Sequence, residues 1–351
     1  MRPGPEAETA PATPPEPGRA RGRVDHVVIL DGTFSSLEPG QMSNAGLAFR
    51  LLAEGGPRAH RTLYYEEGIQ WKGWRRSWDV ATGVGIDAQI CRAYGHLASH
   101  YREGDRIFLM GYSRGAFAVR SLAGVIDRIG LLRRDCATER NVRLAYRHYR
   151  LQAGEEVVRA FAHAHCHLEA PIEMVGVWDT VKALGLRLPL MWMITAQDHS
   201  FHSFHLGSSI RHGFQALALD ETRAVFEPVL WQCPPGWEGN VEQVWFRGAH
   251  GDIGGQLGDF EAARPLSNIP LVWMLDRGEA CGLALPEGWR LRFPCDPQAP
   301  MVGTWRSWGR VFLLRRRRQV GRDRSERLHD SVSGRARNRW RADTEERQAA
   351  E

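Results

Sequence analysis

Lysine and long apolar runs are nearly absent from the sequence, and each absence narrows what the chain can be. Lysine occurs only at positions 72 and 182 of the 351 residues, so arginine carries almost all of the positive charge. No run of about 18 apolar residues occurs, which argues against a transmembrane helix. Residues 1–23 lack the apolar core of a signal peptide and are rich in Pro, Ala, Glu and Arg. We interpret them as a disordered leader and expect a cytoplasmic protein, unless a signal-independent secretion system exports it.

The cysteines and histidines do not form the spacings that metal or redox sites need. The six cysteines are scattered without Cys-x-x-Cys pairs, which favours reduced thiols in a cytoplasmic chain. The helix-spaced histidines 163 and 167 have no cysteine or carboxylate at ligand spacing. The first predicted strand ends in Asp-Gly-Thr, which lacks the glycine spacing of a phosphate or dinucleotide loop. We therefore expect neither a metal nor another cofactor.

Positive charge is concentrated at the carboxyl end of the chain. The net charge is +5, and residues 302–351 hold fourteen arginines against seven acidic residues, including the run 315–318. We interpret residues 301–351 as an arginine-rich extension. It is either a solvated surface or a peripheral contact with an anionic membrane, and nucleic acid is the less favoured partner.

Alternating apolar strands and amphipathic helices predict an α/β fold. Strand patterns and helix patterns follow one another, which implies parallel strands joined by helical crossovers and a mostly parallel sheet with helices on both faces. Residues 24–300 form the expected catalytic domain, and residues 184–207 form a helical insertion that is either a lid or a helix packed on the core. The strands are expected at 26–30, 60–65, 107–110, 172–178 and 241–246, and helices at 43–52, 86–101, 114–129, 136–150, 155–167, 210–225 and 270–281.

The most informative segment is a Gly-x-Ser-x-Gly motif between a predicted strand and a predicted helix. An apolar strand leads into Gly111, Ser113 and Gly115, and a helical pattern follows. This is the context of a nucleophile elbow, in which the two glycines allow a strained turn that lifts the serine above the sheet. The elbow also places the amide of Arg114 at a helix N-terminus, where it can stabilise an oxyanion.

A serine nucleophile needs a base, and the base needs an orienting carboxylate. Asp179 follows the strand at 172–178 and His250 follows the strand at 241–246, which gives the order Ser, Asp, His at one end of a parallel sheet. Asp179 could instead cap a helix, and His250 could be a buried structural histidine. The rivals are His329, which has no predicted strand before it, and Asp252, which would strain to reach a histidine two residues away.

Three residues after the first strand are further candidates for the site. Asp31, Gly32 and Thr33 end that strand at the same edge of the sheet as Ser113. We expect the Gly32 amide to be the second oxyanion donor, while the Asp31 carboxylate could orient a loop.

Several ordered motifs together resemble the α/β-hydrolase family DUF2235, which includes the catalytic part of type VI secretion phospholipase effectors of the Tle1 class. The resemblance implies a serine hydrolase of lipid esters with Ser113, Asp179 and His250 in the catalytic roles. Two positions depart from the family pattern: Gln215 replaces a usual histidine, and Asn268 replaces a usual aspartate. The motifs lie at residues 30–33, 104–124, 176–181, 216–221, 250–255, 266–274 and 326–332.

We therefore predict a serine hydrolase that cleaves carboxylic esters, most readily phospholipid or other lipid esters, through an acyl-enzyme. The alternative from another class is a non-catalytic protein that binds anionic membrane or nucleic acid through its arginines. A Ser-Asp dyad, which needs no histidine, is a second chemical alternative.

Overall fold

The computed structural model describes residues 22–54, 60–69, 84–181, 206–233, 236, 239–306, 314–334, 337, 338 and 340. The predicted insertion at 184–207 and the predicted leader at 1–23 therefore lie outside the described residues, except for the last two positions of each. Among the described helices, none is long and apolar enough to cross a membrane.

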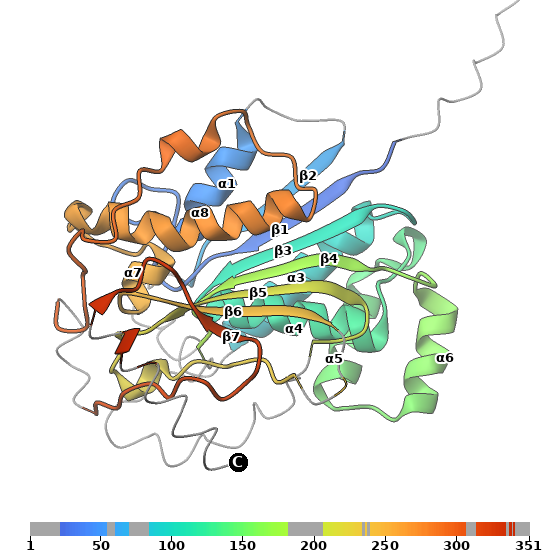
Figure 1. The fold of residues 1–351 in the computed structure, drawn as a ribbon. Helices are drawn as coiled ribbons and strands as arrows, with labels where there is room; N and C mark the ends of the chain where they lie inside the picture. Colours follow the sequence, from blue (N-terminus) through green and yellow to red (C-terminus); the bar gives the residue numbers. More distant parts are fainter. Residues whose placement is uncertain are drawn as a thin grey trace, which may run out of the picture.

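Seven parallel strands form one sheet at the centre of the molecule (Figure 1). Their spatial order is β2-β1-β3-β4-β5-β6-β7, so the chain starts near one edge of the sheet and finishes at the other. The fold is α/β-hydrolase-like, as the sequence predicts. The strands are β1 (Asp25–Leu30), β2 (Arg61–Glu66), β3 (Arg106–Tyr112), β4 (Ile172–Trp178), β5 (Ile210–Ala218), β6 (Asn240–Phe246) and β7 (Glu326–Leu328).

Helices cover both faces of the sheet, and each face has its own apolar core (Figure 1). Helices α1 (Asn44–Ala53) and α8 (Arg264–Ala280) pack on one face. On the other face lie α3 (Val84–His100) and α4 (Arg114–Ile129), with α5 (Glu139–Arg150) and α6 (Glu155–His165) packed against α4. The short helix α7 (His250–Gly254) follows β6 at the end of the sheet where the parallel strands finish.

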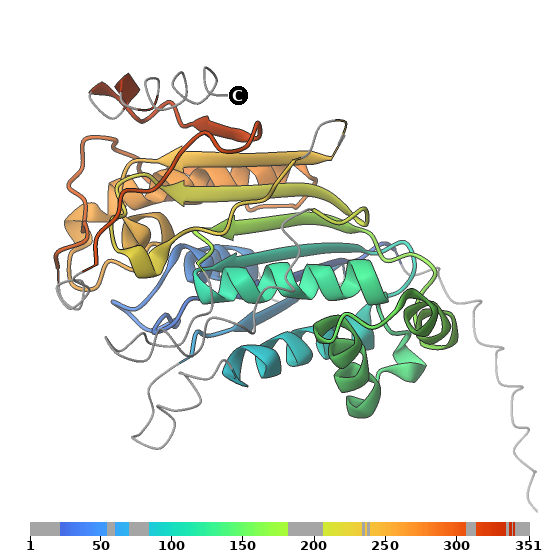
Figure 2. The same cartoon turned by 90° about the horizontal axis from the view of Figure 1, so that it is seen from below.

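Two strands differ from the sequence prediction. Residues 210–225 do not form a helix, because Ile210–Ala218 is β5, a strand hydrogen-bonded to β4 and β6. Tertiary burial between two strands overrides the helical tendency of its Ala-Leu-Ala segment. The last strand is β7 rather than β6, and it pairs with β6 from Gln243↔Glu326 to Trp245↔Leu328. Figure 2 shows this short red strand at the edge of the sheet.

Strand β7 lies beyond residue 300, the predicted end of the catalytic domain. A catalytic domain that ends at residue 300 omits one strand of the central sheet. Residues 314–325 lead into β7 and lie along the 222–226 segment, where Ala224 donates to Leu314 O (3.0 Å) and Arg316 N donates to Thr222 O (2.7 Å). We call residues 314–325 the carboxyl strap. The strap and β7 belong to the same folded unit as Ser113.

Candidate active site

Ser113 lies in the strained turn between β3 and α4. Its backbone has φ 56° and ψ −119°, a conformation that a residue with a side chain rarely adopts. The two glycines of the motif are required by close backbone approach. A Cβ at Gly115 would lie 2.2 Å from Leu30 O, and a Cβ at Gly111 would lie 2.7 Å from Gly115 O. The sequence thus forms the predicted elbow, with the Ser113 side chain at the amino end of α4.

Ser113, His250 and Asp179 form a continuous line of hydrogen bonds. The Ser113 hydroxyl lies 2.8 Å from His250 Nε2, and His250 Nδ1 lies 2.5 Å from Asp179 Oδ2. Because a carboxylate only accepts, Nδ1 is the donor and Nε2 is free to accept from the serine. The three residues come from the ends of β3, β6 and β4, and the parallel sheet brings these ends to one edge.

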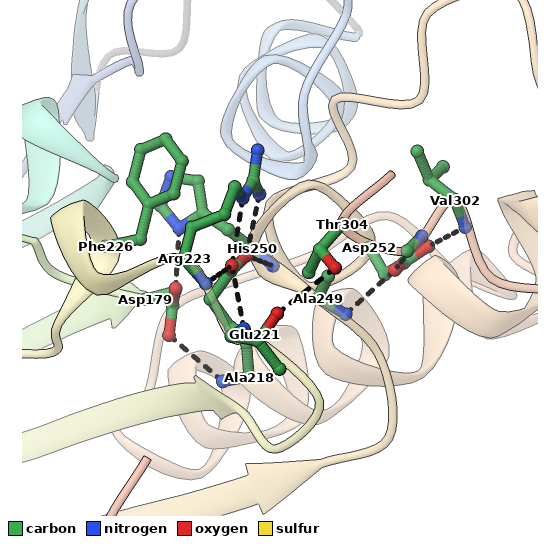
Figure 3. A network of polar contacts seen from close by, with 12 residues as sticks. Asp179, Ala218, Glu221, Arg223, Phe226, Ala249, His250, Asp252, Val302 and Thr304 are labelled. Carbon is green, nitrogen blue, oxygen red and sulfur yellow. Dashed lines mark hydrogen bonds and ion pairs between the residues drawn. The ribbon is translucent and has the colours of Figure 1, made fainter. Parts of the chain in front are cut away.

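Aromatic rings and a buried carboxylate hold His250 in place (Figure 3). The imidazole stacks on Phe226 with ring centroids 4.7 Å apart and an angle of 11°, and the Tyr112 ring lies 5.0 Å away. The backbone amide of His250 donates to Glu221 Oε2 at 3.1 Å. Glu221 is itself paired with Arg223, whose guanidinium lies over the Phe226 ring. These contacts restrict the rotation of the imidazole, and the sequence analysis assigned no role to Glu221 or Phe226.

Asp179 is fully buried and remains charged because it has cationic and hydrogen-bonding partners. Like Ser113 it has a positive φ, 44°, a backbone conformation that residues with a side chain rarely adopt. Burial alone raises the pKa of this carboxyl, but the Arg318 guanidinium and the hydrogen bond from His250 lower it. The pKa is therefore held well below its usual range, and Asp179 is an anion at neutral pH. Its helix-capping alternative does not fit, because its side chain faces His250 and Arg318.

Arg318 reaches Asp179 from the carboxyl strap. Its Nη1 lies 2.5 Å from Asp179 Oδ1, and its Nη2 donates to Oδ2 at 2.8 Å. The Arg318 side chain is only 3% exposed, although it belongs to the run 315–318 that the sequence analysis treated as a solvated or membrane-facing surface. No local pattern distinguishes it from its exposed neighbours Arg316 and Arg317. Sequence reasoning missed this residue because its partner lies 139 positions away.

The predicted oxyanion donors have different surroundings. Arg114 opens α4, and the first amides of a helix have no intrahelical partner, so its N–H is available beside Ser113. Gly32 lies close to Ser113, since a Cβ on it would be 3.2 Å from Ser113 Cβ. Its amide, however, donates to Asp31 Oδ1 at 2.7 Å and is therefore engaged in this conformation, so its role as the second donor stays a prediction. Within the described residues, the buried hydroxyl of the neighbouring Thr33 has no hydrogen-bond partner.

Asp31 links the first strand to its neighbours. It accepts from the Ser43 hydroxyl at 2.6 Å and from the Tyr65 hydroxyl at 2.8 Å. Ser43 is the N-cap of α1, so Asp31 fixes the start of that helix and the Gly32 turn together. Burial raises the pKa of Asp31 to about 6, although hydrogen bonds from Ser43, Tyr65 and Gly32 oppose the rise. The contacts favour the loop-orienting interpretation of this carboxylate.

The rival acid and base have other partners. Asp252 accepts from the Ala249 amide at 2.8 Å and from the Val302 amide at 2.6 Å, so it ties α7 to residues 302–303 (Figure 3). His329 does follow a strand, β7, contrary to expectation, but its Nδ1 contacts the Ser331 hydroxyl at 2.8 Å and its ring stacks on Phe246. In the part of the chain that the structure describes, the side chains of Asp252 and His329 form no hydrogen bond with Ser113 or with the His250 ring.

The two family departures lie away from this line of residues. Gln215 on β5 accepts from the buried Arg120 guanidinium at 3.2 Å and donates to Val229 O. Asn268 on α8 donates to Pro294 O at 2.8 Å. Both therefore serve packing in the described structure. Within the same residues, no three His, Cys, Asp or Glu side chains gather as a metal site.

Comparisons with known proteins found a matching family and several similar proteins. The chain is 27% identical over 238 residues to the uncharacterised protein YEL023C of Saccharomyces cerevisiae, covering 60% of this chain and 33% of the yeast protein. An uncharacterised protein from Pseudomonas aeruginosa aligns in structure with a TM-score of 0.43 and 15% identity, covering 78% of this chain and 49% of that one. The Tle1 effector bound to the VgrG spike of the type VI secretion system aligns with a TM-score of 0.38 and 18% identity, covering 68% and 52%.

The chain spans about a third of the yeast relative and about half of each solved structure. A family model described as the catalytic domain of Tle1-like phospholipase effectors of the type VI secretion system matches residues 25–277, from the start of β1 into α8. The match contains Ser113, Asp179 and His250, and it ends before the carboxyl strap. The chain belongs to the family of Tle1-like phospholipase effector catalytic domains.

Proposed function

We propose that this protein hydrolyses lipid esters, with Ser113 as nucleophile, His250 as general base and Asp179 as the orienting acid. The observation that carries the proposal is the hydrogen-bonded line from Ser113 Oγ through His250 to Asp179, positioned at a strained elbow. The family name supports an ester of a phospholipid as the substrate class. No step of this chemistry needs a metal or an organic cofactor.

In the first half of the reaction, His250 Nε2 takes the proton of the Ser113 hydroxyl while Oγ attacks the ester carbonyl. The imidazolium that forms is stabilised by the anionic Asp179, 2.5 Å from Nδ1. The Arg114 amide donates to the developing oxyanion, and the unpartnered Thr33 hydroxyl is the second donor that we propose in place of Gly32. Collapse of the tetrahedral intermediate breaks the ester C–O bond, and His250 returns its proton to the leaving alcohol oxygen.

In the second half, water repeats the sequence on the acyl-enzyme. His250 takes a proton from the water, hydroxide oxygen bonds to the acyl carbon, and Ser113 leaves with the proton. The fatty acid is released and the site returns to its starting state. Peripheral membrane contact and export remain predictions.

The test is covalent labelling by a fluorophosphonate probe, followed by hydrolysis of a short-chain ester and of phospholipid vesicles. We expect wild-type labelling that Ser113→Ala abolishes, with residual hydrolysis below about one part in a thousand. Loss of activity in His250→Ala excludes a Ser-Asp dyad. A folded wild type that is not labelled contradicts the proposal.

The non-catalytic alternative receives little support from the arginine run. Arg318 is committed to Asp179, and Arg315 donates to Thr304 O at 3.2 Å. Two of the four arginines in the run therefore bind groups of the protein itself. Arg316 and Arg317 are exposed and are the two that could contact an anionic partner.

A further inference from the structure

The Arg318 guanidinium contacts the Asp179 carboxylate directly, and both side chains are almost completely buried. The Arg318 and Asp179 side chains are 3% and 0% exposed, so neither is screened by water. A buried ion pair requires good geometry to offset desolvation. The fork of the guanidinium meets both carboxylate oxygens, which is the bidentate arrangement that only arginine provides.

The carboxylate of Asp179 has no free acceptor position. Oδ1 accepts from the Ala218 amide at 3.0 Å and from Arg318 Nη1, and Oδ2 accepts from Arg318 Nη2 and His250 Nδ1. A carboxylate offers about four acceptor sites, so each is used. Rotation of the carboxylate away from His250 would break at least two charged hydrogen bonds.

Arg318 also braces the surroundings of the imidazole. Nη1 donates to Ala218 O at 3.0 Å, and Nη2 donates to the carbonyl of Phe226. Phe226 carries the ring that stacks on His250. One guanidinium therefore fixes the carboxylate at Nδ1 and the residue that lies against the imidazole face.

We propose that Arg318 is a positioning residue of the site, which locks the Asp179 carboxylate against His250 and weakens the pull of that carboxylate on the imidazolium. The proposal rests on the proposed function. Its second part follows from charge: a guanidinium beside the carboxylate opposes a positive charge on His250.

The other charges around His250 do not cancel this effect. Glu221 accepts from the His250 amide but is neutralised by Arg223, and Asp252 on the same short helix faces residues 302–303. Within the part of the chain that the structure describes, the titratable groups in direct contact with His250 are Tyr112, Asp179 and Glu221, and Arg223 and Arg318 pair with the two carboxylates.

Two substitutions at Arg318 separate its role in positioning Asp179 from the effect of its charge. Arg318→Lys keeps the positive charge but loses the two-pronged guanidinium. We expect the rate of fluorophosphonate labelling on its high-pH plateau to fall about tenfold. The acid limb of the pH profile, where the rate falls at low pH, should stay at the same pH. Arg318→Met removes the charge, and we expect the acid limb to move up by about one to two pH units. Labelling at pH 6 should then fall more than labelling at pH 9.

The matched control is Arg317→Met, which removes the same charge from an exposed neighbour. It should leave both plateau and limb at wild-type values. If Arg318→Lys and Arg318→Met both keep the wild-type profile, the proposal is overturned. If Arg318→Met does not fold, Arg318→Lys decides, because an unchanged plateau overturns the positioning role.

A double variant tests whether Arg318 acts through Asp179. In the Asp179→Asn background, Arg318→Met should change labelling by less than about threefold, since its partner is already gone. An undiminished effect in that background contradicts the proposal.

An NMR measurement of the His250 Nδ1 proton separates this proposal from the proposed function. Its hydrogen bond to Asp179 should give a downfield resonance in the wild type and in Arg317→Met, and this resonance should weaken in Arg318→Met, whether or not Ser113 reacts with the probe. An unlabelled wild type with this difference would contradict only the hydrolase, and a labelled wild type without it would contradict only the positioning role.

Discussion

Two buried aspartates follow parallel strands at the same edge of the sheet, and they have opposite electrostatic surroundings. Asp31 after β1 is 1% exposed and accepts from neutral donors, namely two hydroxyl groups and the Gly32 amide. Asp179 after β4 is 0% exposed and faces Arg318 and His250. Burial raises the pKa of Asp31 to about 6, whereas the pKa of Asp179 is held well below its ordinary 3.8.

The comparison shows that the charge of these two carboxylates is decided by their hydrogen-bonding and ionic partners and not by how deeply they are buried. Neutral hydrogen bonds only partly offset desolvation at Asp31, while the Arg318 guanidinium and the hydrogen bond from His250 together exceed it at Asp179. A permanently anionic group suits the stabilisation of an imidazolium. A carboxyl that takes up a proton near pH 6 suits a structural link between β1, β2 and α1.

The largest expected effect separates the two carboxylates by catalysis. Asp179→Asn should lower kcat for ester hydrolysis by about 10⁴-fold, because the amide favours the wrong imidazole tautomer. Asp31→Asn, which still offers an acceptor to Gly32 and Ser43, should change kcat by less than about tenfold. Steady-state kinetics on a short-chain ester measures both.

Folding is the necessary control, because Asp179→Asn leaves Arg318 buried without its counter-charge. The Asp179→Asn, Arg318→Met double variant removes both charges and should fold at least as well as the single variant while remaining inactive. Equal losses of kcat in the two aspartate variants would contradict the division of roles.

The next prediction concerns how the free energy of unfolding changes with pH, which Asp31 and Asp179 affect in opposite directions. Between about pH 4 and 6 the unfolded chain has lost the proton of Asp31 but the folded protein keeps it, so rising pH destabilises the fold by up to about 3 kcal/mol. The contribution of Asp179 is complete above its ordinary pKa of 3.8 and is lost as the pH falls below that value.

Urea unfolding of the wild type and Asp31→Asn measures the first part. From pH 4 to pH 7, the free energy of unfolding of the variant should gain about 2–3 kcal/mol relative to that of the wild type. Parallel curves for the two proteins would show that Asp31 ionises normally in the fold.

The smallest effect tests one neutral donor. Tyr65→Phe removes a hydroxyl that donates to Asp31 at 2.8 Å, and it should lower the free energy of unfolding by about 1 kcal/mol. The same change should raise the pKa of Asp31 further, which extends the destabilising window to higher pH. Hydrolysis should stay at the wild-type rate, and a loss as large as that of Asp179→Asn would place Tyr65 in the chemistry instead.

Local patterns in the sequence predicted the parts of the molecule that local patterns determine. The elbow needs glycine at two fixed positions beside Ser113, and the strand before it is an unbroken apolar run, so motif and flanks agree. Asp179 and His250 were found because parallel strands deliver their ends to one edge. Each of these inferences depends on a few neighbouring residues.

Features that depend on distant partners were missed. The segment of β5 has a helical sequence pattern, and it forms a strand because β4 and β6 pair with it on either side. The three residues of β7 are too few to show a strand pattern. The hydrogen bond from the Gly32 amide to Asp31 was missed because it depends on a turn that no residue spacing reveals. Arg318 was missed for the same reason. An arginine in a basic run is expected to be exposed to solvent, and only the folded chain brings the Asp179 carboxylate next to it.

The place of the carboxyl strap in the chain sets an order of assembly. A ribosome makes Ser113, Asp179 and His250 before Arg318, so the nascent chain contains the whole hydrogen-bonded line while its acid still lacks a counter-ion. The strap joins only when residue 318 has emerged and β7 can pair with β6. A chain truncated at residue 300 would keep every residue of that line, yet it would lack the guanidinium that pairs with the Asp179 carboxylate.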